Sequence, residues 1–199
     1  MAYRSLTEEE INVLDDNGCW AENWDNVKVS DDFAPKYMRH VMLYGDVAIG
    51  SFEKNIEVSP GFLKHSGIRN ATLRNVSVGD NCLIENIGNY INNYTIGNDC
   101  YISNVSTMET TEGATFGQGN LISVLNEVGD GNVVLFDGLN SQIAALMVKY
   151  NRDRGFWAAM RRLIGEDIKA TSPDRGTLGD GVKIVNTKEI TNTVIGEEC

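Results

Sequence analysis

Large apolar residues recur every six positions through the middle of the chain. The members of this series are Val78, Ile84, Tyr90, Ile96, Ile102 and Met108. Alternate residues of a strand face the same side, so Cys82 and Cys100, two positions before members of the series, are also expected to face inward. The spacing predicts short parallel strands stacked in layers, with Val78 over Ile96. On this reading the two cysteines are core residues rather than metal ligands.

Turn-forming residues punctuate the apolar series. Gly79-Asp80-Asn81 and Gly97-Asn98-Asp99 occupy equivalent places in consecutive layers, and such residues tolerate the backbone angles of sharp corners. Further asparagines follow aliphatic residues by two positions: Asn70, Asn75, Asn86, Asn104, Asn186 and Asn192. We expect these asparagines to form a hydrogen-bonded ladder at the corners. The alternative is a row of amides that binds a ligand.

Two segments have helical rather than six-residue spacing. Thr7 and Glu10 form a capping-box pattern that predicts a short N-terminal helix. Between Gly138 and Ala170, apolar residues at helical spacing predict a helical hairpin with Ser141 as the first N-cap. The fold prediction is therefore an all-β solenoid, a parallel β-helix with a cap helix and a helical-hairpin insert. Its expected parts are a cap at 1–30, β-helix layers at 31–137, the insert at 138–172 and resumed layers at 173–199.

The composition of the chain limits the kinds of partner and the location that we expect for it. The 199 residues carry a formal net charge of -11, which argues against general nucleic-acid binding. The sequence has neither a long apolar run nor a secretory leader, so we expect no membrane segment and a cytoplasmic location. The repeat stops in mid-layer at Cys199, which suggests either a fragment of a longer protein or an end covered by another subunit.

The aliphatic-Gly hexads resemble the hexapeptide-repeat superfamily. They are Val78-Gly79, Ile96-Gly97, Leu178-Gly179 and Ile195-Gly196. The resemblance implies a left-handed β-helix and a homotrimer, and it is the only source of the handedness. The superfamily includes acyltransferases, γ-class carbonic anhydrases and sugar-nucleotide enzymes. The chain is also similar to the N-terminal part of a family of long, uncharacterised bacterial proteins that carry a domain of unknown function.

Three segments carry that second resemblance. They are 6–11 with Asn17-Gly18-Cys19, then Val124-Leu125-Asn126-Glu127, and Gln142-Ile143-Ala144-Ala145-Leu146. The resemblance brings no established activity with it.

Histidine is the first candidate for catalysis. Superfamily acyltransferases use a histidine as general base beside acetyl-CoA, and only His40 and His65 occur here. His65, next to Lys64 in an irregular stretch, is the candidate catalytic residue, and Lys64 is a candidate ligand-binding residue. The alternative for His65 is an exposed loop histidine. Two histidines are too few for a carbonic-anhydrase zinc site, so no metal is expected.

Two further places are candidates for ligand binding. Asn126 and Glu127 lie in an irregular polar segment that forms either a loop or the wall of a site. Arg161 and Arg162 belong to the helical insert, which contains six basic residues and only three acidic ones. This excess indicates either a solvated helix face or a site for an anionic small molecule with phosphate or carboxylate groups.

Two functions remain open from the sequence. The first is a structural or oligomerisation module of a larger protein, which forms a homo-oligomer. The second is an acyltransferase-like or sugar-nucleotide-linked transferase with a site between subunits, using acetyl-CoA or a nucleotide sugar. The small number of histidines favours the module.

Overall fold

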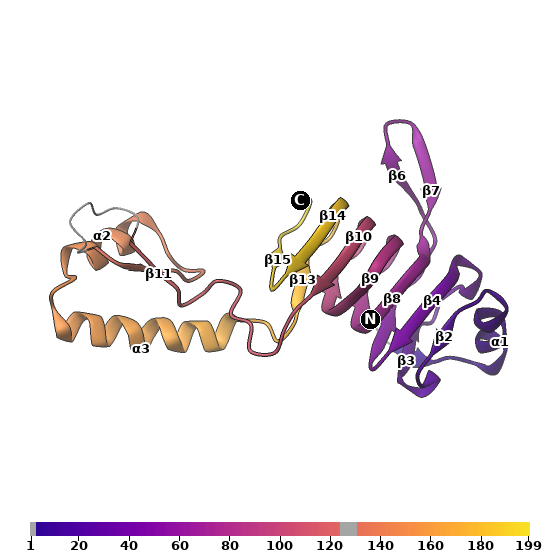
Figure 1. The fold of residues 1–199 in the computed structure, drawn as a ribbon, viewed down its shortest axis with the longest axis horizontal. Coiled ribbons are helices and arrows are strands. Elements are labelled where there is room, and N and C mark those ends of the chain that lie inside the picture. Colours follow the sequence, from indigo (N-terminus) through magenta and orange to yellow (C-terminus); the bar gives the residue numbers. More distant parts are fainter. Residues whose placement is uncertain (1–2, 124–130) are drawn as a thin grey trace. The chain divides into compact units, whose positions relative to one another are not determined.

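A computed structural model describes residues 3–123 and 131–199 of the chain (Figure 1). The chain divides into two compact units. The first, called the sheet unit, comprises Met1–Glu112 and Arg175–Cys199. The second, called the inserted unit, comprises Gly113–Asp174.

The sheet unit contains most of the strands. Before the insert these are β1 (Tyr3–Ser5), β2 (Trp20–Ala21), β3 (Val27–Ser30), β4 (Met38–Tyr44), β5 (Val47–Ile49), β6 (Asn55–Ser59), β7 (Phe62–His65), β8 (Gly67–Val78), β9 (Leu83–Ile96) and β10 (Tyr101–Glu109). After the insert they are β13 (Gly176–Leu178), β14 (Lys183–Thr191) and β15 (Val194–Ile195). Eleven of them form one sheet, in which only β1 pairs antiparallel, while β6 and β7 form a separate hairpin.

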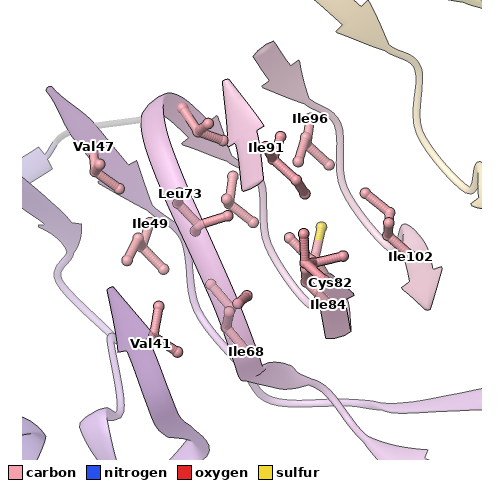
Figure 2. Packing of buried hydrophobic residues seen from close by; sticks show 14 of the residues in the cluster. Val41, Val47, Ile49, Ile68, Leu73, Cys82, Ile84, Ile91, Ile96 and Ile102 are labelled. Atoms are coloured by element: carbon pink, nitrogen blue, oxygen red, sulfur yellow. The ribbon is translucent and has the colours of Figure 1, made fainter. Parts of the chain in front are cut away.

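Buried apolar side chains form continuous rows across the parallel strands. Ile84 pairs in register with Ile68 on β8 and with Ile102 on β10, and all three are fully buried (Figure 2). Val78 pairs with Ile96, as the spacing of eighteen residues predicted. Cys82 and Cys100 are buried free thiols, which confirms the core reading. The core is thus held by residues one strand apart rather than by a distant segment.

The prediction for Tyr90 is wrong. Its side chain is 37% exposed, and Ile91 takes the buried position instead, in register with Leu73 and Met108. The pairing of β9 with β8 and with β10 shifts register near this point. An irregular strand of this kind breaks a strict period of six, because one extra residue moves the following side chains to the opposite face.

Asparagines with positive φ bend the long strands. All six asparagines of the predicted ladder have φ between 50° and 57°, a region that asparagine enters more readily than most residues. The Nδ2 of Asn70 donates to Oδ1 of Asn86 over 3.0 Å, and Asn104 donates to Asn186 in the same way. The predicted side-chain ladder is therefore confirmed at these two pairs.

A second ladder joins side chains to the backbone at the Gly-Asx corners. Oδ1 of Asn98 accepts the backbone N–H of Asp80 over 2.8 Å, and Oδ1 of Asp180 accepts that of Asn98 over 2.7 Å. Asp80 binds the backbone N–H of Ser51 in the same manner, over 2.8 Å. Each corner thus satisfies a donor of the preceding one. A carboxylate or amide is needed at each of these positions.

The fold-class prediction requires correction. The described residues form a mixed α/β structure with an eleven-stranded, mostly parallel sheet and three α-helices, so the expectation of an all-β solenoid, the left-handed β-helix, is wrong. The predicted short strands are parts of long ones, since β8 has 12 residues and β9 has 14. Six-residue spacing reports which residues pair and where the backbone bends. It does not determine how the strands assemble into a sheet.

The N-terminal helix begins as predicted. Helix α1 (Glu8–Asp16) has Thr7 as its N-cap, and Glu10 completes the capping box. Gly18 follows the helix with φ of +72°, and a Cβ there would meet the ring of His40. Two short 3₁₀ helices, η1 (Trp24–Asn26) and η2 (Pro35–Tyr37), complete the region.

The inserted unit has its own core. It contains α2 (Ser141–Lys149), α3 (Arg154–Thr171) and the antiparallel pair β11 (Leu121–Ile122) and β12 (Val133–Val134). Its buried apolar residues, among those the structure describes, are Val133, Val134, Met147 and Ile164. The N-cap of α2 is Asn140, whose Oδ1 accepts from the backbone of Ile143, rather than the predicted Ser141. None of the helices formed by residues 3–123 and 131–199 is long and apolar enough to cross a membrane.

Candidate functional site

The base of the β6–β7 hairpin packs against the beginnings of two strands of the main sheet. Ile56 on β6 lies in a buried cluster with Leu83 of β9 and Tyr101 of β10, separate from the main core. Within the hairpin, Ile56 is paired with Lys64 and Asn55 with His65. The hairpin therefore holds Lys64 and His65 near the sheet, while its tip extends away from the sheet (Figure 1).

A buried carboxylate lies beneath this hairpin. Glu85 on β9 is only 6% exposed. The Nζ of Lys64 lies 2.8 and 3.1 Å from its two oxygens, and Nη1 of Arg69 is 3.8 Å away. The hydroxyls of Tyr101 and Ser103 donate to Oε1 over 3.4 Å. A buried charge needs such partners, so Lys64 fixes the hairpin to the sheet through Glu85.

His65 is held in one orientation. Its ring stacks on that of Tyr37, with centroids 3.9 Å apart and planes 13° apart. Nδ1 lies 3.0 Å from the carbonyl oxygen of Ser66, and Arg69 donates to the carbonyl of His65 over 3.0 Å. A carbonyl only accepts, so Nδ1 donates in this contact. In the neutral ring Nε2 then has the lone pair, which is the tautomer that a general base requires. The catalytic role of His65 stays a prediction.

Arg161 lines a pocket in the inserted unit. The pocket has a volume of about 180 Å³, and its lining residues are Leu121, Gly131, Asn132, Asn151, Arg152, Trp157 and Arg161. The guanidinium carbon of Arg161 lies 5.8 Å from the ring centroid of Trp157, within cation–π range. Arg162, one residue later, instead pairs with Glu166 over 3.1 Å on the exposed side of α3. Only one of the two predicted arginines therefore lines this pocket.

Two of the predicted ligand-binding residues, Asn126 and Glu127, lie outside the described residues. Lys64 and His65 belong to the sheet unit, and Arg161 and Arg162 belong to the inserted unit. Within residues 3–123 and 131–199, no three His, Cys, Asp or Glu side chains are placed to hold a metal ion.

Sequence reasoning missed the most highly connected residue of the hairpin base. Glu85 stands in Leu83-Ile84-Glu85-Asn86-Ile87, a run that is otherwise mainly apolar. A carboxylate in such a run is a signal for a buried, paired charge, because an unpaired one would be very costly. Its partners Lys64 and Arg69 come from neighbouring elements, β7 and β8. Spacing alone does not identify them.

Comparisons with known proteins place the chain in a family. Residues 3–199 match the family described as "Domain of unknown function (DUF4954)". An uncharacterized protein of Treponema pallidum (strain Nichols) is 33% identical over 164 residues, which cover 77% of this chain and 22% of that protein. The chain thus spans about a fifth of its relative's length. No solved structure matches.

The family match also corrects the resemblance proposed from the hexads. The family shown is DUF4954 and not the hexapeptide-repeat superfamily, so that resemblance no longer supports an acyltransferase activity or a trimer. The hexads misled because they mark where parallel strands pair in register, Val78 with Ile96 and Ile96 with Leu178, and not the family. This chain belongs to the DUF4954 family of domains of unknown function.

Proposed function

We propose that this chain is a structural and oligomerisation module of a longer protein, and that copies associate through the β6–β7 hairpin. One observation carries the proposal: the base of the hairpin is fixed, while its tip is apolar and exposed. Phe62 is 55% exposed and Leu63 is 58% exposed, beside a turn at Gly61 with φ of +75°. The length of the Treponema pallidum relative is consistent with a module in a larger chain.

The physical argument is the balance between order and exposure. An isolated two-stranded hairpin is marginally stable in water, but this one is held by the Lys64–Glu85 ion pair and by Ile56. A fixed arm loses little conformational entropy when it binds. Burying the exposed parts of Phe62 and Leu63 in a second copy would contribute about 2 kcal/mol per arm.

Sedimentation velocity tests the association. The wild type is expected to form oligomers. The double variant Phe62→Ser with Leu63→Ser should need a roughly tenfold higher protein concentration to associate for each 1.4 kcal/mol of association free energy that is lost. The matched control is Val185→Ser with Val194→Ser, since these residues are 46% and 47% exposed elsewhere on the sheet unit. A monomeric wild type, or equal effects of both double variants, would contradict the proposal.

A second candidate function is binding of an anionic small molecule in the Arg161 pocket. The specific observation is that Arg161 and Arg152 line one hollow together with Trp157 and two asparagines. Guanidinium groups and amides donate the hydrogen bonds that phosphate or carboxylate oxygens accept. An aromatic ring beside them provides an apolar wall, as is usual for ligand pockets.

A thermal-shift series with inorganic phosphate, acetyl-CoA and a nucleotide sugar tests this pocket. A ligand at 100 times its Kd stabilises the protein by about 2.7 kcal/mol. Arg161→Gln should abolish the shift, and Arg162→Gln, outside the pocket and paired with Glu166, should preserve it. If no anion shifts the melting temperature, or if both variants behave alike, the pocket does not have this function.

The transferase alternative depends on His65 and shares this screen. Its support is the tautomer that leaves Nε2 free to take a proton. Acetyl-CoA would then stabilise the protein, and product would form with a pH profile that His65→Gln removes. The module proposal is preferred because the fixed hairpin with an apolar tip needs no ligand to explain it.

A further inference from the structure

One face of the main sheet has an open groove lined by tyrosines and hydrogen-bonding side chains. We call it the sheet-face groove; its volume is about 410 Å³ and its lining residues are Tyr44, Thr72, Arg74, Tyr90, Asn92 and Glu109. They come from four neighbouring strands, β4, β8, β9 and β10. The Arg161 pocket and the β6–β7 hairpin contribute none of these residues.

Strand register arranges these side chains in a row. Tyr44 pairs with Arg74, Arg74 with Asn92, and Asn92 with Glu109. Parallel strands lie about 4.8 Å apart, so successive groups of the row recur at about that distance. The row runs beside the fully buried one that contains Leu73, and the alternation of strand residues turns it outward. The result is a linear set of groups across the strands.

The aromatic groups of the groove are held in place. The hydroxyl of Tyr90 donates to Oε2 of Glu109 over 3.0 Å, and the residue is 37% exposed. This hydrogen bond to a carboxylate raises the pKa of Tyr90. Tyr44 packs edge-on against Trp20, with ring centroids 5.4 Å apart. Trp20 is itself 50% exposed and extends the aromatic surface beyond the groove.

We propose that the sheet-face groove binds a neutral oligosaccharide. Each sugar hydroxyl both donates and accepts, and the groove offers a donor in Arg74, an acceptor in Glu109 and both kinds in Asn92. The apolar face of a sugar ring packs on an aromatic ring as other apolar groups do. An open, linear groove fits a chain of sugar units rather than a compact molecule.

Charge balance argues against a strongly charged ligand, and the pairing of the strands argues against an extended peptide. Arg74 and Glu109 balance each other within the groove, so a strongly anionic or cationic ligand gains little there. An extended peptide binds a sheet most strongly at an edge, where backbone groups are unpaired. The strands of the groove are instead paired in register within the sheet, β4 with β8, β8 with β9 and β9 with β10.

Titration of the full chain with defined probes tests the proposal. The neutral probes are the hexamers of β-1,4-glucose, β-1,4-xylose, α-1,4-glucose and N-acetylglucosamine. A galacturonic acid hexamer serves as the acidic probe, and an uncharged peptide of similar length completes the set. Binding is followed by tryptophan fluorescence, to which Trp20 contributes, and by NMR shifts of the Asn92 side-chain amide. At least one neutral hexamer is expected to bind with a Kd below roughly 10 mM, more tightly than the acidic probe or the peptide.

Tyr90→Ala provides the decisive variant. It should weaken binding by at least roughly tenfold, the loss of about one ring contact. Tyr150→Ala is the matched control, because Tyr150 is 41% exposed on the inserted unit, and it should leave the Kd unchanged. Tyr90→Phe keeps the ring and should retain most of the binding, provided that circular dichroism shows all variants folded.

Three results would overturn the proposal. One is that no neutral hexamer binds up to roughly 10 mM. Another is that the acidic probe or the peptide binds more tightly. The third is that Tyr90→Ala changes oligomeric state rather than sugar affinity, which would make this face an interface between copies.

Discussion

Replacing Glu85 by glutamine removes the charge beneath the β6–β7 hairpin and keeps the shape of the side chain. In the wild type, two cations and two hydroxyls surround this carboxylate: Lys64, Arg69, Tyr101 and Ser103. After the substitution, Lys64 and Arg69 face a neutral amide whose NH₂ group cannot accept a hydrogen bond. We therefore expect a loss of stability that is largest at the hairpin base.

The magnitude follows from the exposure of the three charged groups. Removing one partner of a fully buried pair costs about 3–5 kcal/mol, whereas an exposed pair contributes about 0.2–1 kcal/mol. The Glu85 side chain is 8% exposed, but Lys64 and Arg69 are 37% and 30% exposed and can be partly solvated. The expected loss lies between these limits, at about 2 kcal/mol.

Urea unfolding of Glu85→Gln and of Glu53→Gln measures this loss. Glu53 is exposed, so its substitution should change the free energy of unfolding by less than about 0.5 kcal/mol. Lys64→Met, alone and combined with Glu85→Gln, gives the coupling energy, which should exceed about 1 kcal/mol. Hydrogen exchange should rise first in β6 and β7. A loss below about 0.5 kcal/mol for Glu85→Gln, or no coupling to Lys64, would refute the reasoning.

Three further predictions test the sheet and its first helix. Gly176→Ala should destabilise by about 2 kcal/mol in thermal unfolding, because the new Cβ would meet the buried Tyr94 ring, whereas Gly165→Ala, with no atom near its Cβ, should not destabilise. Asn86→Ala should cost about 1 kcal/mol and Asn86→Gly less, since φ is 57° there; equal losses in urea unfolding would show that backbone strain is not the cause. Arg4 lies 2.7 Å from the carboxylate of Glu10, and its guanidinium lowers the pKa of Glu10 to about 2. The pair therefore stabilises the fold above about pH 4.5 and loses this effect as pH falls through 2. Glu10→Gln should therefore lose about 1 kcal/mol at pH 7 and progressively less as pH falls toward 2; a constant difference in unfolding free energy across that range would contradict the assignment.

Much of the local structure was predictable because its causes lie close together in the sequence. The capping box of Thr7 and Glu10 needs four residues, and the chain forms it as predicted. The asparagines adopt positive φ because their own side chains tolerate it. The pairing of Val78 with Ile96 followed from a repeat length of eighteen. The first two features follow from short-range preferences, whereas the third follows from the length of the repeat.

The candidate site was predictable only in part. Lys64 and His65 were selected for their chemistry, but the role of Lys64 depends on Glu85, from a different strand. Arg161 and Arg162 looked equivalent, and helix α3 directs one to a pocket and the other to Glu166. A helix rotates each residue by about 100° from the one before it, so adjacent residues face different surroundings.

By itself the sequence determined most of the apolar residues that stack, where the backbone bends and where the N-terminal helix begins. Those features follow from alternation, turn chemistry and capping, all of which act over a few residues. The tertiary structure alone decided that the strands join into one mixed, mostly parallel sheet, that Tyr90 faces outward and that Glu85 is buried among cations. These outcomes depend on contacts between residues sixteen or more positions apart in the sequence. A shift of the strand register by one residue there exchanges the inner and outer faces.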